Sequence, residues 1–456
     1  MRTLSLLLAF AASVSAQADW TNLGGNAARN GLTASVGPVA PELAWGTGPS
    51  SIIAWHPCIT GDRVYLVRQL SFVPSGVPND AEVYCLDLAD GSVVWSATVP
   101  YESGDWTPVL YGVANGRVFS GRGGNGNSVS APVHCYDAAT GTEQWVSDEE
   151  VATGSYDGVV FADDGDPVFA TNQYVRRIDA ATGATVWNTP RNCSVSGDCG
   201  PCIANGAVYV DEVAPGGQVV TRFDLESGER LYSSPIMPGF LSQNTPLAGP
   251  DGSLYYPRTQ GNELTDFFYA FTDTGTELIQ RWFVPCVAGA GSQHATAADG
   301  SVYILSPAAT LQRLDAETGA VIGESAMAVA GAGAQSHFAI GGDGTVYYGN
   351  GGFPGTVFAF TADLELNWSV VVPNLNQGGP SLGPDGTLVV CGNGTVVRAY
   401  RTTPACAAAD LNCDGVVDGA DLGALLGAWG GRGPADLNGD GVVDGADLGE
   451  MLAAWG

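Results

Sequence analysis

Positive charge is scarce in this sequence. The 456 residues include 17 basic and 47 acidic side chains, giving a net charge of −30 at pH 7, and charged residues make up only 14% of the chain. Nucleic acids and anionic membrane surfaces attract proteins through basic patches. We therefore expect no nucleic acid and no anionic membrane among the partners of this protein.

Long apolar runs are also lacking. The clearest one, residues 4–12, follows Arg2 and precedes the small residues Val14, Ser15 and Ala16. It is too short to cross a bilayer as a helix, and no later run is longer, so membrane insertion is not expected. A basic head, a short apolar stretch and a small-residue cleavage site are typical of a secretory signal peptide. We predict that residues 1–18 are this peptide and that the mature chain is secreted, extracellular or at the cell surface.

No two of the ten cysteines are adjacent in the sequence. In an exported chain, cysteines at this frequency predict several disulfides. Two local pairs are expected: Cys193 with Cys199 or Cys202, and Cys406 with Cys413. The alternative at the first cluster is a metal site, but neither a histidine nor a second C-x-x-C accompanies it.

A hairpin signal occurs eight times. Each copy is a small-residue turn followed by an alternating apolar strand, as in ANGRVFS from Ala114 and GGDGTVYY from Gly341. Asn-Gly and Asp-Gly between such runs indicate hairpins, because the turn needs positive φ. The eight copies begin at Thr60, Ala114, Asp163, Ala204, Gly249, Ala297, Gly341 and Gly383.

A second pattern, strand–turn–strand with an aromatic residue in the outgoing strand, alternates with the hairpins. It reads VHCYDAATGTEQW up to Trp145 and VRRIDAATGATVW up to Trp187. A four-stranded unit of this period indicates the blade of an all-β propeller. The turn glycines lie 42 to 50 residues apart, at Gly91, Gly141, Gly183, Gly228, Gly275 and Gly319.

The number of blades follows from how the ring closes. Eight hairpins but only seven complete second patterns precede Thr402, and the eighth unit ends with a third strand at residues 395–401. A matching fourth strand, Glu-Leu-Ala-Trp, stands at residues 42–45. Pairing it with the last unit closes the ring and removes the open edges. This predicts an eight-bladed β-propeller with four-stranded blades, with seven blades as the alternative.

The D-x-x-T-G-x-x-x-W repeat and the opening DWTNLGGNAARNG, residues 19–31, resemble the PQQ-type propeller family. The resemblance covers residues 19–402 and implies a fold rather than a function, because the family includes quinone-dependent dehydrogenases and non-catalytic assembly scaffolds. In such a fold we expect the tryptophans to pack between blades and Asp-x-x-Thr-Gly to stabilise a turn.

A quinone cofactor (PQQ) is not expected. Dehydrogenases of that family typically carry a disulfide of adjacent cysteines over the cofactor, and no motif here places their catalytic Asp or their calcium cage. HExxH, GxSxG and P-loop motifs are also missing. A hydrolase or lyase using two carboxylates is an alternative that propellers can support. Most acidic residues here, however, fall in turn positions.

Two nearly identical segments follow a linker at residues 403–409 and make up residues 410–456. Each places Asp, Asn and Asp at loop positions 1, 3 and 5, Gly at 6, and Asp at 9 and 12. Ca²⁺ takes about six to eight oxygen ligands in loops of this spacing, one of them a backbone carbonyl at position 7. We predict two Ca²⁺ ions, held by Asp410, Asn412, Asp414, Val416, Asp418 and Asp421, and by Asp436, Asn438, Asp440, Val442, Asp444 and Asp447.

Each loop runs into an apolar stretch, residues 422–429 and 448–455, which predicts one short helix. Such tandem loop–helix units resemble a type I dockerin, which implies docking onto a cohesin-like protein. The helices are short, rich in Ala and Gly, and end in Trp429 and Trp455, so a calcium-stabilised tag that attaches the chain to the cell surface is the alternative. A module this small should fold only with its metal.

Polar and aromatic residues precede the innermost strands. If they ring the central funnel, they form a mouth suited to a saccharide or another small ligand. The alternative is that they only pack the channel or cap strand ends. These candidate ligand residues are His56, Trp106, Tyr156, Asn244, His294, His337 and Gln377.

Two classes of function are consistent with the sequence. The first is a secreted, non-catalytic binding or scaffold propeller that is attached to a partner or to the cell surface through its calcium module. The second is a secreted propeller enzyme, a polysaccharide-acting hydrolase or lyase or a quinone-dependent dehydrogenase, that carries the same module as a tag. No catalytic residue can be assigned in the second case.

Overall fold

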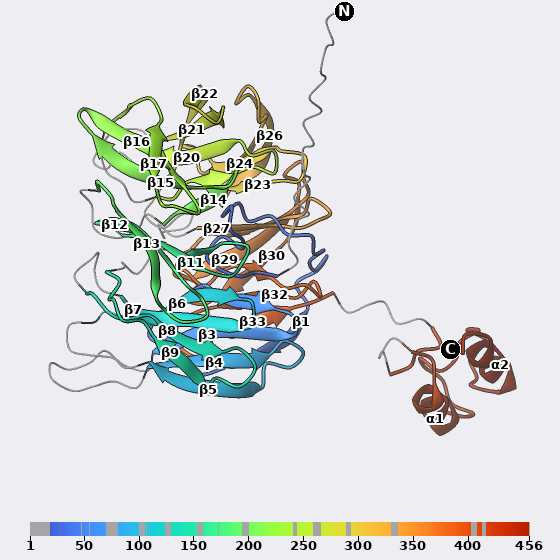
Figure 1. Ribbon diagram of the computed structural model, residues 1–456. Coiled ribbons are helices and arrows are strands. Elements are labelled where there is room, and N and C mark those ends of the chain that lie inside the picture. Colours follow the sequence, from blue (N-terminus) through green and yellow to red (C-terminus); the bar gives the residue numbers. More distant parts are fainter. Residues whose placement is uncertain are drawn as a thin grey trace, which may run out of the picture. The chain divides into compact units, whose positions relative to one another are not determined.

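The computed structural model describes residues 19–46, 48–53, 55–69, 81–99, 105, 107–123, 129–152, 158–171, 173–193, 200–239, 244–258, 266–288, 293–329, 336–402, 408–412 and 416–455. The chain divides into two compact units, Met1–Arg401 and Thr402–Gly456. The first unit is built of β-strands and the second contains two short helices (Figure 1). Among the described residues, no helix is both long and apolar enough to cross a membrane.

The β-unit is an eight-bladed propeller, as predicted, and its blades are antiparallel sheets built on four strands, which are consecutive along the chain in blades 1 to 7. The first strands of neighbouring blades contact one another, so they line the central axis. Blade 1 contains β2 (Cys58–Thr60), β3 (Arg63–Gln69), β4 (Ala81–Asp87) and β5 (Val93–Val99), and blade 2 contains β6 (Thr107–Ala114), β7 (Arg117–Gly123), β8 (His134–Asp137) and β9 (Glu143–Val146). Blade 3 contains β10 (Val160–Phe161), β11 (Pro167–Ala170), β12 (Tyr174–Ile178) and β13 (Thr185–Pro190). Blade 4 contains β14 (Cys202–Ala204), β15 (Ala207–Ala214), β16 (Gly217–Asp224) and β17 (Arg230–Ser233), with the short β18 (Met237–Pro238) beside β16.

Blades 5 to 7 repeat this order, and blade 8 takes its fourth strand from the other end of the unit. Blade 5 contains β19 (Leu247–Ala248), β20 (Leu254–Arg258), β21 (Asp266–Asp273) and β22 (Leu278–Cys286), and blade 6 contains β23 (Ala295–Thr296), β24 (Val302–Leu305), β25 (Thr310–Leu314) and β26 (Val321–Ala328). Blade 7 contains β27 (His337–Ile340), β28 (Val346–Gly349), β29 (Gly355–Phe360) and β30 (Leu366–Val372). Blade 8 contains β31 (Ser381–Leu382), β32 (Leu388–Cys391), β33 (Val397–Tyr400) and β1 (Leu43–Gly46).

Ring closure by the N-terminal strand is confirmed. β1 pairs antiparallel with β33, with Leu43 opposite Tyr400 and Trp45 opposite Ala399. The last blade therefore has its full complement of four strands, with β1 as the outermost, so that β33 is not left as an open edge. The alternative of seven blades is wrong.

The Asn-Gly turns adopt the conformation that their residues favour. Asn115 and Gly116, between β6 and β7, have φ of 47° and 74°, and Asn205 and Gly206, between β14 and β15, have φ of 52° and 67°. Two consecutive positive φ values match the right-handed twist of the paired strands, and Asn and Gly adopt them at the lowest cost.

Tryptophans close the seams between blades, as the repeat predicts. The ring of Trp95 lies against the turn glycine Gly141 of the next blade, and its Nε1 donates to the carbonyl of Ala138 at 2.9 Å. A side chain at Gly141, where φ is 71°, would collide with that ring. The same arrangement joins Trp45 to Gly91, Trp145 to Gly183, Trp187 to Gly228 and Trp282 to Gly319.

The turn that carries this glycine is held by its own aspartate. Oδ1 of Asp137 accepts hydrogen bonds from the backbone N–H of Ala139 and Thr140 and from the Thr140 hydroxyl, at 3.1, 2.9 and 2.9 Å. These bonds hold the pKa of Asp137 below its usual value. Asp-x-x-Thr-Gly is therefore a structural motif, and its repetition accounts for many carboxylates of the propeller.

Residues 19–36, which we name the N-terminal belt, run along the first strands of successive blades. The belt contacts blade 3 through the side chain of Asn22, which donates a hydrogen bond to the Val159 carbonyl at 2.8 Å. Through these contacts the belt joins blades that are far apart in the sequence. Its backbone hydrogen bonds join Trp20 to Ile59 in blade 1, Thr21 to Val113 in blade 2, Ala27 to Ile203 in blade 4, Ala28 to Ala248 in blade 5, Asn30 to Thr296 in blade 6, and Gly31 and Thr33 to Ile340 in blade 7.

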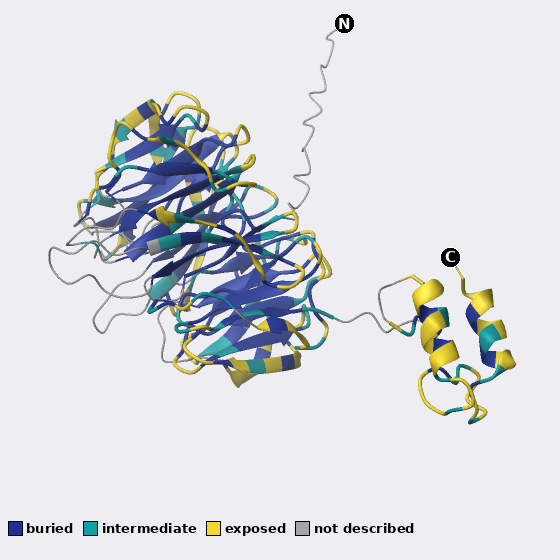
Figure 2. Ribbon diagram, turned by 90° about the horizontal axis from the view of Figure 1, so that it is seen from below, coloured by how far each residue is buried: buried dark blue, intermediate teal, exposed yellow. Residues whose placement is uncertain are grey.

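The second unit contains α1 (Gly419–Gly427) and α2 (Gly445–Ala453). Both begin earlier than predicted, because Asp418 and Asp444 act as N-caps and accept hydrogen bonds from the backbone N–H of Ala420 and Ala446. Trp429 and Trp455 consequently lie beyond the helix ends. Figure 2 shows buried residues concentrated in the blades, whereas both helices are exposed over much of their surface.

The prediction of several disulfides is wrong for most of the described cysteines, which are buried free thiols. Cys202 is a buried free thiol, so it is not the partner of Cys193. Cys199, Cys406 and Cys413 lie outside the described residues. Free thiols buried between the blades behave as small apolar side chains, and they therefore supply packing rather than cross-links. The other buried free cysteines are Cys58, Cys85, Cys135, Cys286 and Cys391.

Candidate functional site

The second of the two Asp-rich loops is described in full and is already folded around its own ligand positions. Oδ2 of Asp436, at position 1, accepts from the backbone N–H of Gly441, at position 6, at 2.8 Å. Gly441 has a φ of 96°, which only glycine adopts easily. Oδ1 of Asp436 is buried and has no hydrogen-bond partner. The loop therefore contains one carboxylate oxygen that is buried and accepts no hydrogen bond.

Position 12 of this loop is a fully buried carboxylate. Asp447 is fully buried; its Oδ1 accepts from the N–H of Leu437 and Asn438 at 2.7 and 3.1 Å, and its Oδ2 accepts from Asp444 at 2.7 Å. These backbone donors hold its pKa below the usual value. Position 12 thus ties the start of the loop to the start of α2.

The first loop repeats this arrangement where it is described. Asp421, also fully buried, accepts from the N–H of Asn412 at 3.0 Å and of Asp418 at 2.9 Å. Asp410 is buried and Val416 is exposed. Asp414, at position 5, lies outside the described residues. The two loops therefore share the same bond between position 12 and the helix N-cap.

No three His, Cys, Asp or Glu side chains come close enough to hold a metal ion, within the part of the chain that the structure describes. In loops of this type an amide oxygen and a backbone carbonyl complete the ligand set, so fewer carboxylates need to converge. Residues 410–456 nevertheless contain nine acidic side chains and one basic residue, Arg432. Their mutual repulsion makes a bound cation favourable.

The predicted ring of channel residues is buried rather than exposed at a mouth, where it is described. Trp106 and Tyr156 lie outside the described residues. The rings of His56 and His337, from blades 1 and 7, lie 5.0 Å apart between centroids. Gln377, from blade 8, lines a small cavity together with His56. His294 packs instead against Phe268, and Asn244 donates to a backbone carbonyl, so neither joins the His56–His337 pair.

Arg29 of the N-terminal belt places a positive charge among these histidines. It is 2% exposed, and a side chain at Gly158 or Gly200 would collide with its guanidinium. Burial, and then the Arg29 charge, lower the pKa of His337 to about 3. The pKa of His56 is lowered by the same causes, with His337 contributing as well, and burial lowers the pKa of His294 to about 4. All three imidazoles are neutral at pH 7.

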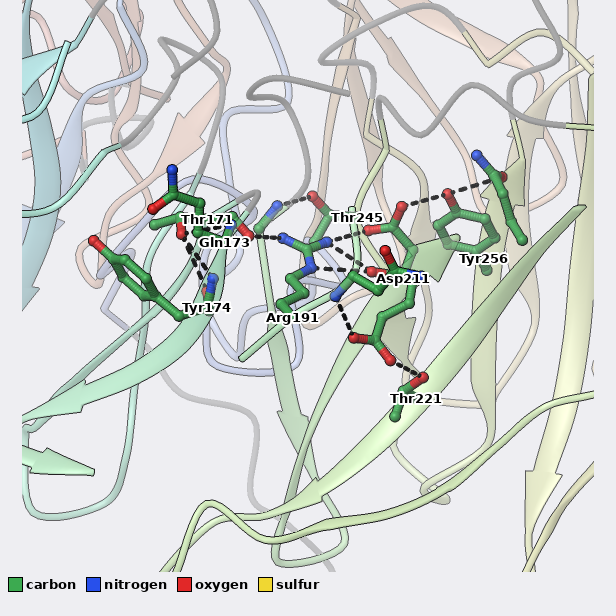
Figure 3. Close-up of polar contacts among 12 residues, drawn as sticks. Thr171, Gln173, Tyr174, Arg191, Asp211, Thr221, Thr245 and Tyr256 are labelled. Carbon is green, nitrogen blue, oxygen red and sulfur yellow. Dashed lines mark hydrogen bonds and ion pairs between the residues drawn. The ribbon is translucent and has the colours of Figure 1, made fainter. Parts of the chain in front are cut away.

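A buried ion-pair network that the repeat pattern does not predict lies between blades 3, 4 and 5 (Figure 3). Arg191 binds Asp211 through Nη2 and Oδ1 at 2.6 Å, with both side chains fully buried, and donates to the Thr171 carbonyl at 2.9 Å. The Tyr256 hydroxyl approaches the other Asp211 oxygen at 3.3 Å. The next residue, Glu212, pairs with Arg230. Consecutive acidic residues inside the apolar strand VYVDEVA are the sequence signal that would have revealed this network.

A cleft of about 800 Å³ lies where the hairpin turns of blades 1 to 3 meet the N-terminal belt. Its size is in the range of small-ligand sites, but its walls are mainly polar turns rather than aromatic side chains. The charged residues on its walls are Asp19, Asp62, Arg63, Asp137 and Asp163.

Comparison with known proteins supports the fold. The family profile described as outer membrane protein assembly factor BamB matches residues 129–265. BamB from Moraxella catarrhalis superposes with a TM-score of 0.51 at 18% identity, covering 74% of this chain and 98% of that chain. The computationally designed Ika8 protein gives a TM-score of 0.51 at 13% identity, covering 79% of this chain and 99% of that one.

A europium-containing methanol dehydrogenase aligns with a TM-score of 0.49 at 12% identity, covering 75% of this chain and 90% of that chain. No curated protein sequence matches this chain. At these identities the two structures with a TM-score of 0.51 support the propeller fold alone. The assignment of PQQ-type repeats rests on the family profile, and the number of blades on the sheets of this chain.

Proposed function

We propose that this chain is an exported, non-catalytic binding or scaffold propeller that is attached to a partner through two Ca²⁺-loaded loops. The observation that carries the proposal is the second loop, with its buried and unpartnered Asp436 oxygen. An isolated buried carboxylate oxygen is costly. A hard cation bound by oxygen ligands removes that cost.

The other positions of the loop fit the same ion. Asp436 and Asp447 keep free lone pairs, since each oxygen of an ionised carboxylate accepts more than one donor. Asn438 and Asp440 supply further side-chain oxygens, Val442 a carbonyl, and Asp444 a water-mediated contact. The first loop would hold a second ion through Asp410, Asn412, Asp414, Val416, Asp418 and Asp421.

The second unit also carries a surface suited to a protein partner. The two segments expose three apolar residues at equivalent positions, each side chain being 44% to 53% exposed. Exposed apolar residues grouped on a small unit are typical of binding surfaces. A cohesin-like protein or a cell-surface component would bind there. The pairs are Val416 and Val442, Leu426 and Leu452, and Trp429 and Trp455.

A binding role for the propeller is favoured because its carboxylates have structural partners. Asp137, Asp179 and Asp224 accept bonds from their own turns, and Asp211 and Glu212 pair with arginines. Four aspartates, Asp19, Asp62, Asp137 and Asp163, do line the turn-face cleft. Asp62 pairs with Arg63, Asp19 accepts from the N–H of Gly61, and Asp137 is held by its own turn, so these three are already engaged and do not supply the pair of carboxylates that an acid–base mechanism needs. A saccharide or another small ligand would bind in the turn-face cleft or at the channel.

Calorimetric titration of Ca²⁺ into the full chain tests the proposal. We expect two bound ions for the wild type and one for Asp436→Ala, which removes position 1 of the second loop. Glu450→Gln removes an acidic side chain of α2 that lies outside the loops, and it should still bind two ions. Absence of binding to the wild type would refute the calcium proposal and leave the propeller without an attachment module.

A further inference from the structure

The His56–His337 pair in the channel contains hydrogen-bonding atoms that have no partner. Neither ring nitrogen of His337 has a hydrogen-bond partner, although the residue is only 1% exposed, and Nδ1 of His56 is buried and unpartnered as well. Leaving such polar atoms buried without a partner costs free energy. We therefore expect a bound group that is not part of the polypeptide to form hydrogen bonds with these two imidazoles.

The tautomer of His56 determines which kind of group fits. Trp20 donates its indole N–H to Nε2 of His56 at 2.6 Å, so Nε2 is the acceptor and Nδ1 carries the proton. Nδ1–H of His56 is then a donor that lacks an acceptor. His337, neutral in the channel, also has one N–H, whichever nitrogen carries it. The two neighbouring imidazoles, 5.0 Å apart between centroids, thus offer two N–H donors that have no acceptor.

The surroundings favour an acceptor with negative charge. His56, Gln377 and Gly158 line a cavity of about 30 Å³, which is enough for one small ion. His337 is related to this cavity through His56, because the two rings lie 5.0 Å apart between centroids. The Arg29 guanidinium lies against the backbone of Gly158, next to this cavity. None of the described residues that line the cavity is acidic. In a buried channel of low dielectric, a fixed positive charge stabilises an anion more strongly than a neutral molecule.

We propose that the channel of the propeller binds one small monovalent anion of halide size, held by the imidazole N–H groups of His56 and His337 and by the charge of Arg29. The N-terminal belt completes this site, because Trp20 fixes the tautomer of His56 and Arg29 supplies the charge. The anion would bridge blades 1 and 7 and stabilise the closed ring.

Thermal unfolding of the full chain in sodium bromide and in sodium gluconate, at constant ionic strength, tests the proposal. Gluconate is too large for the cavity. We expect the Tm of the propeller to rise by about 2 °C for each tenfold increase in bromide above its Kd. His337→Phe removes one donor and leaves an apolar ring of similar shape, and this variant should lose the specific increase.

His134→Phe is the matched control, since His134 lies in β8 away from the channel, and this variant should keep the increase. Crystals grown in bromide should show anomalous scattering within hydrogen-bond distance of Nδ1 of His56. Equal bromide dependence in the wild type and His337→Phe would overturn the proposal. So would a water molecule in the cavity in place of bromide.

Discussion

Nε1 of Trp20 donates a hydrogen bond to Nε2 of His56 across 2.6 Å, and both side chains are buried. This bond joins the N-terminal belt to the start of blade 1. Trp20 also exchanges backbone hydrogen bonds with Ile59. One residue therefore anchors the belt both to a strand and to the channel.

Trp20→Phe tests this anchor. The substitution removes the indole donor and leaves the buried Nε2 of His56 without a partner, which costs about 1–3 kcal/mol. We expect the free energy of unfolding of the propeller, measured by urea denaturation, to fall by that amount. Trp429→Phe changes an exposed tryptophan of the second unit and should leave the propeller transition unchanged. Equal stability of Trp20→Phe and the wild type would mean that the belt contributes little to the closed ring.

Two glycine substitutions test the packing of tryptophan between blades. Alanine strains the backbone equally at the two positions, so any further difference in stability comes from the tryptophan contact. Gly141 and Gly116 have φ of 71° and 74°, so alanine at either costs about 1–2 kcal/mol. Only at Gly141 would the new Cβ meet the Trp95 ring; at Gly116 nothing lies within 4 Å. We therefore expect Gly141→Ala to lower the unfolding free energy by at least about 1 kcal/mol more than Gly116→Ala. Equal losses of unfolding free energy in the two variants would show that the Trp95 ring moves away from the new Cβ at little cost.

The channel histidines predict that the propeller loses stability as the pH falls. The pKa values of His337 and His294, about 3 and about 4, lie below that of an unfolded histidine, near about 6.5. The unfolded chain therefore takes up protons first, and stability decreases through the window from pH 6.5 towards pH 4. Each such histidine should cost about 2 kcal/mol between pH 7.5 and 5. Turn carboxylates such as Asp137, whose pKa is lowered, lose their contribution only below about pH 4.

Urea denaturation at pH 7.5 and pH 5 measures this effect. His294→Phe keeps a ring–ring contact with Phe268 but has no group that titrates. The difference in unfolding free energy between pH 7.5 and pH 5 should therefore be about 2 kcal/mol smaller in this variant than in the wild type. Phe268→Leu alters the same contact without removing a titratable group, and it should leave this difference as large as in the wild type. A His294→Phe variant with an unchanged pH dependence would contradict the prediction that this imidazole stays neutral.

The architecture of the propeller could be predicted because its causes are local and repeated. Asn-Gly turns, the Asp-x-x-Thr-Gly motif and the tryptophan that follows it each act within one blade or on the next one. The strand at residues 42–45 could be placed because the eighth blade otherwise has an open edge. It is observed as Leu43–Gly46, one residue later.

The channel could not be predicted in the same way. Arg29 lies in the quoted motif DWTNLGGNAARNG, but its position beside His56 and His337 depends on the path of the whole belt across seven blades. The Arg191–Asp211 pair likewise joins the end of one blade to the second strand of the next. The expectation of several disulfides failed for the buried cysteines because composition cannot show that residues such as Cys58, Cys85 and Cys135 face the apolar core. The pairs Cys193–Cys199 and Cys406–Cys413 involve residues outside the described part of the chain and stay predictions.

The Arg191–Asp211 ion pair predicts strongly non-additive substitutions. Both side chains are fully buried, so Asp211→Asn removes the negative charge that faces Arg191 in this pair and should cost about 3–5 kcal/mol. Replacing both residues, as Arg191→Met with Asp211→Leu, removes both charges and should cost much less than the two single substitutions together. Urea denaturation of the four proteins in this cycle measures the coupling. Additive losses would show that the two charges act independently.

Chelation of calcium should unfold the second unit and leave the propeller intact. The core of this unit is very small, and without cations the nine carboxylates of residues 410–456 repel one another. At Ca²⁺ concentrations of about 100 times the Kd, each site would add about 2.7 kcal/mol. Hydrogen exchange of the full chain should therefore show protection of α1 and α2 in Ca²⁺ and its loss in EGTA, with β-strand protection unchanged. Protection that persists in EGTA would mean that the buried core, Ala409, Val417, Leu425, Ala435, Val443 and Met451, holds both helices without a metal.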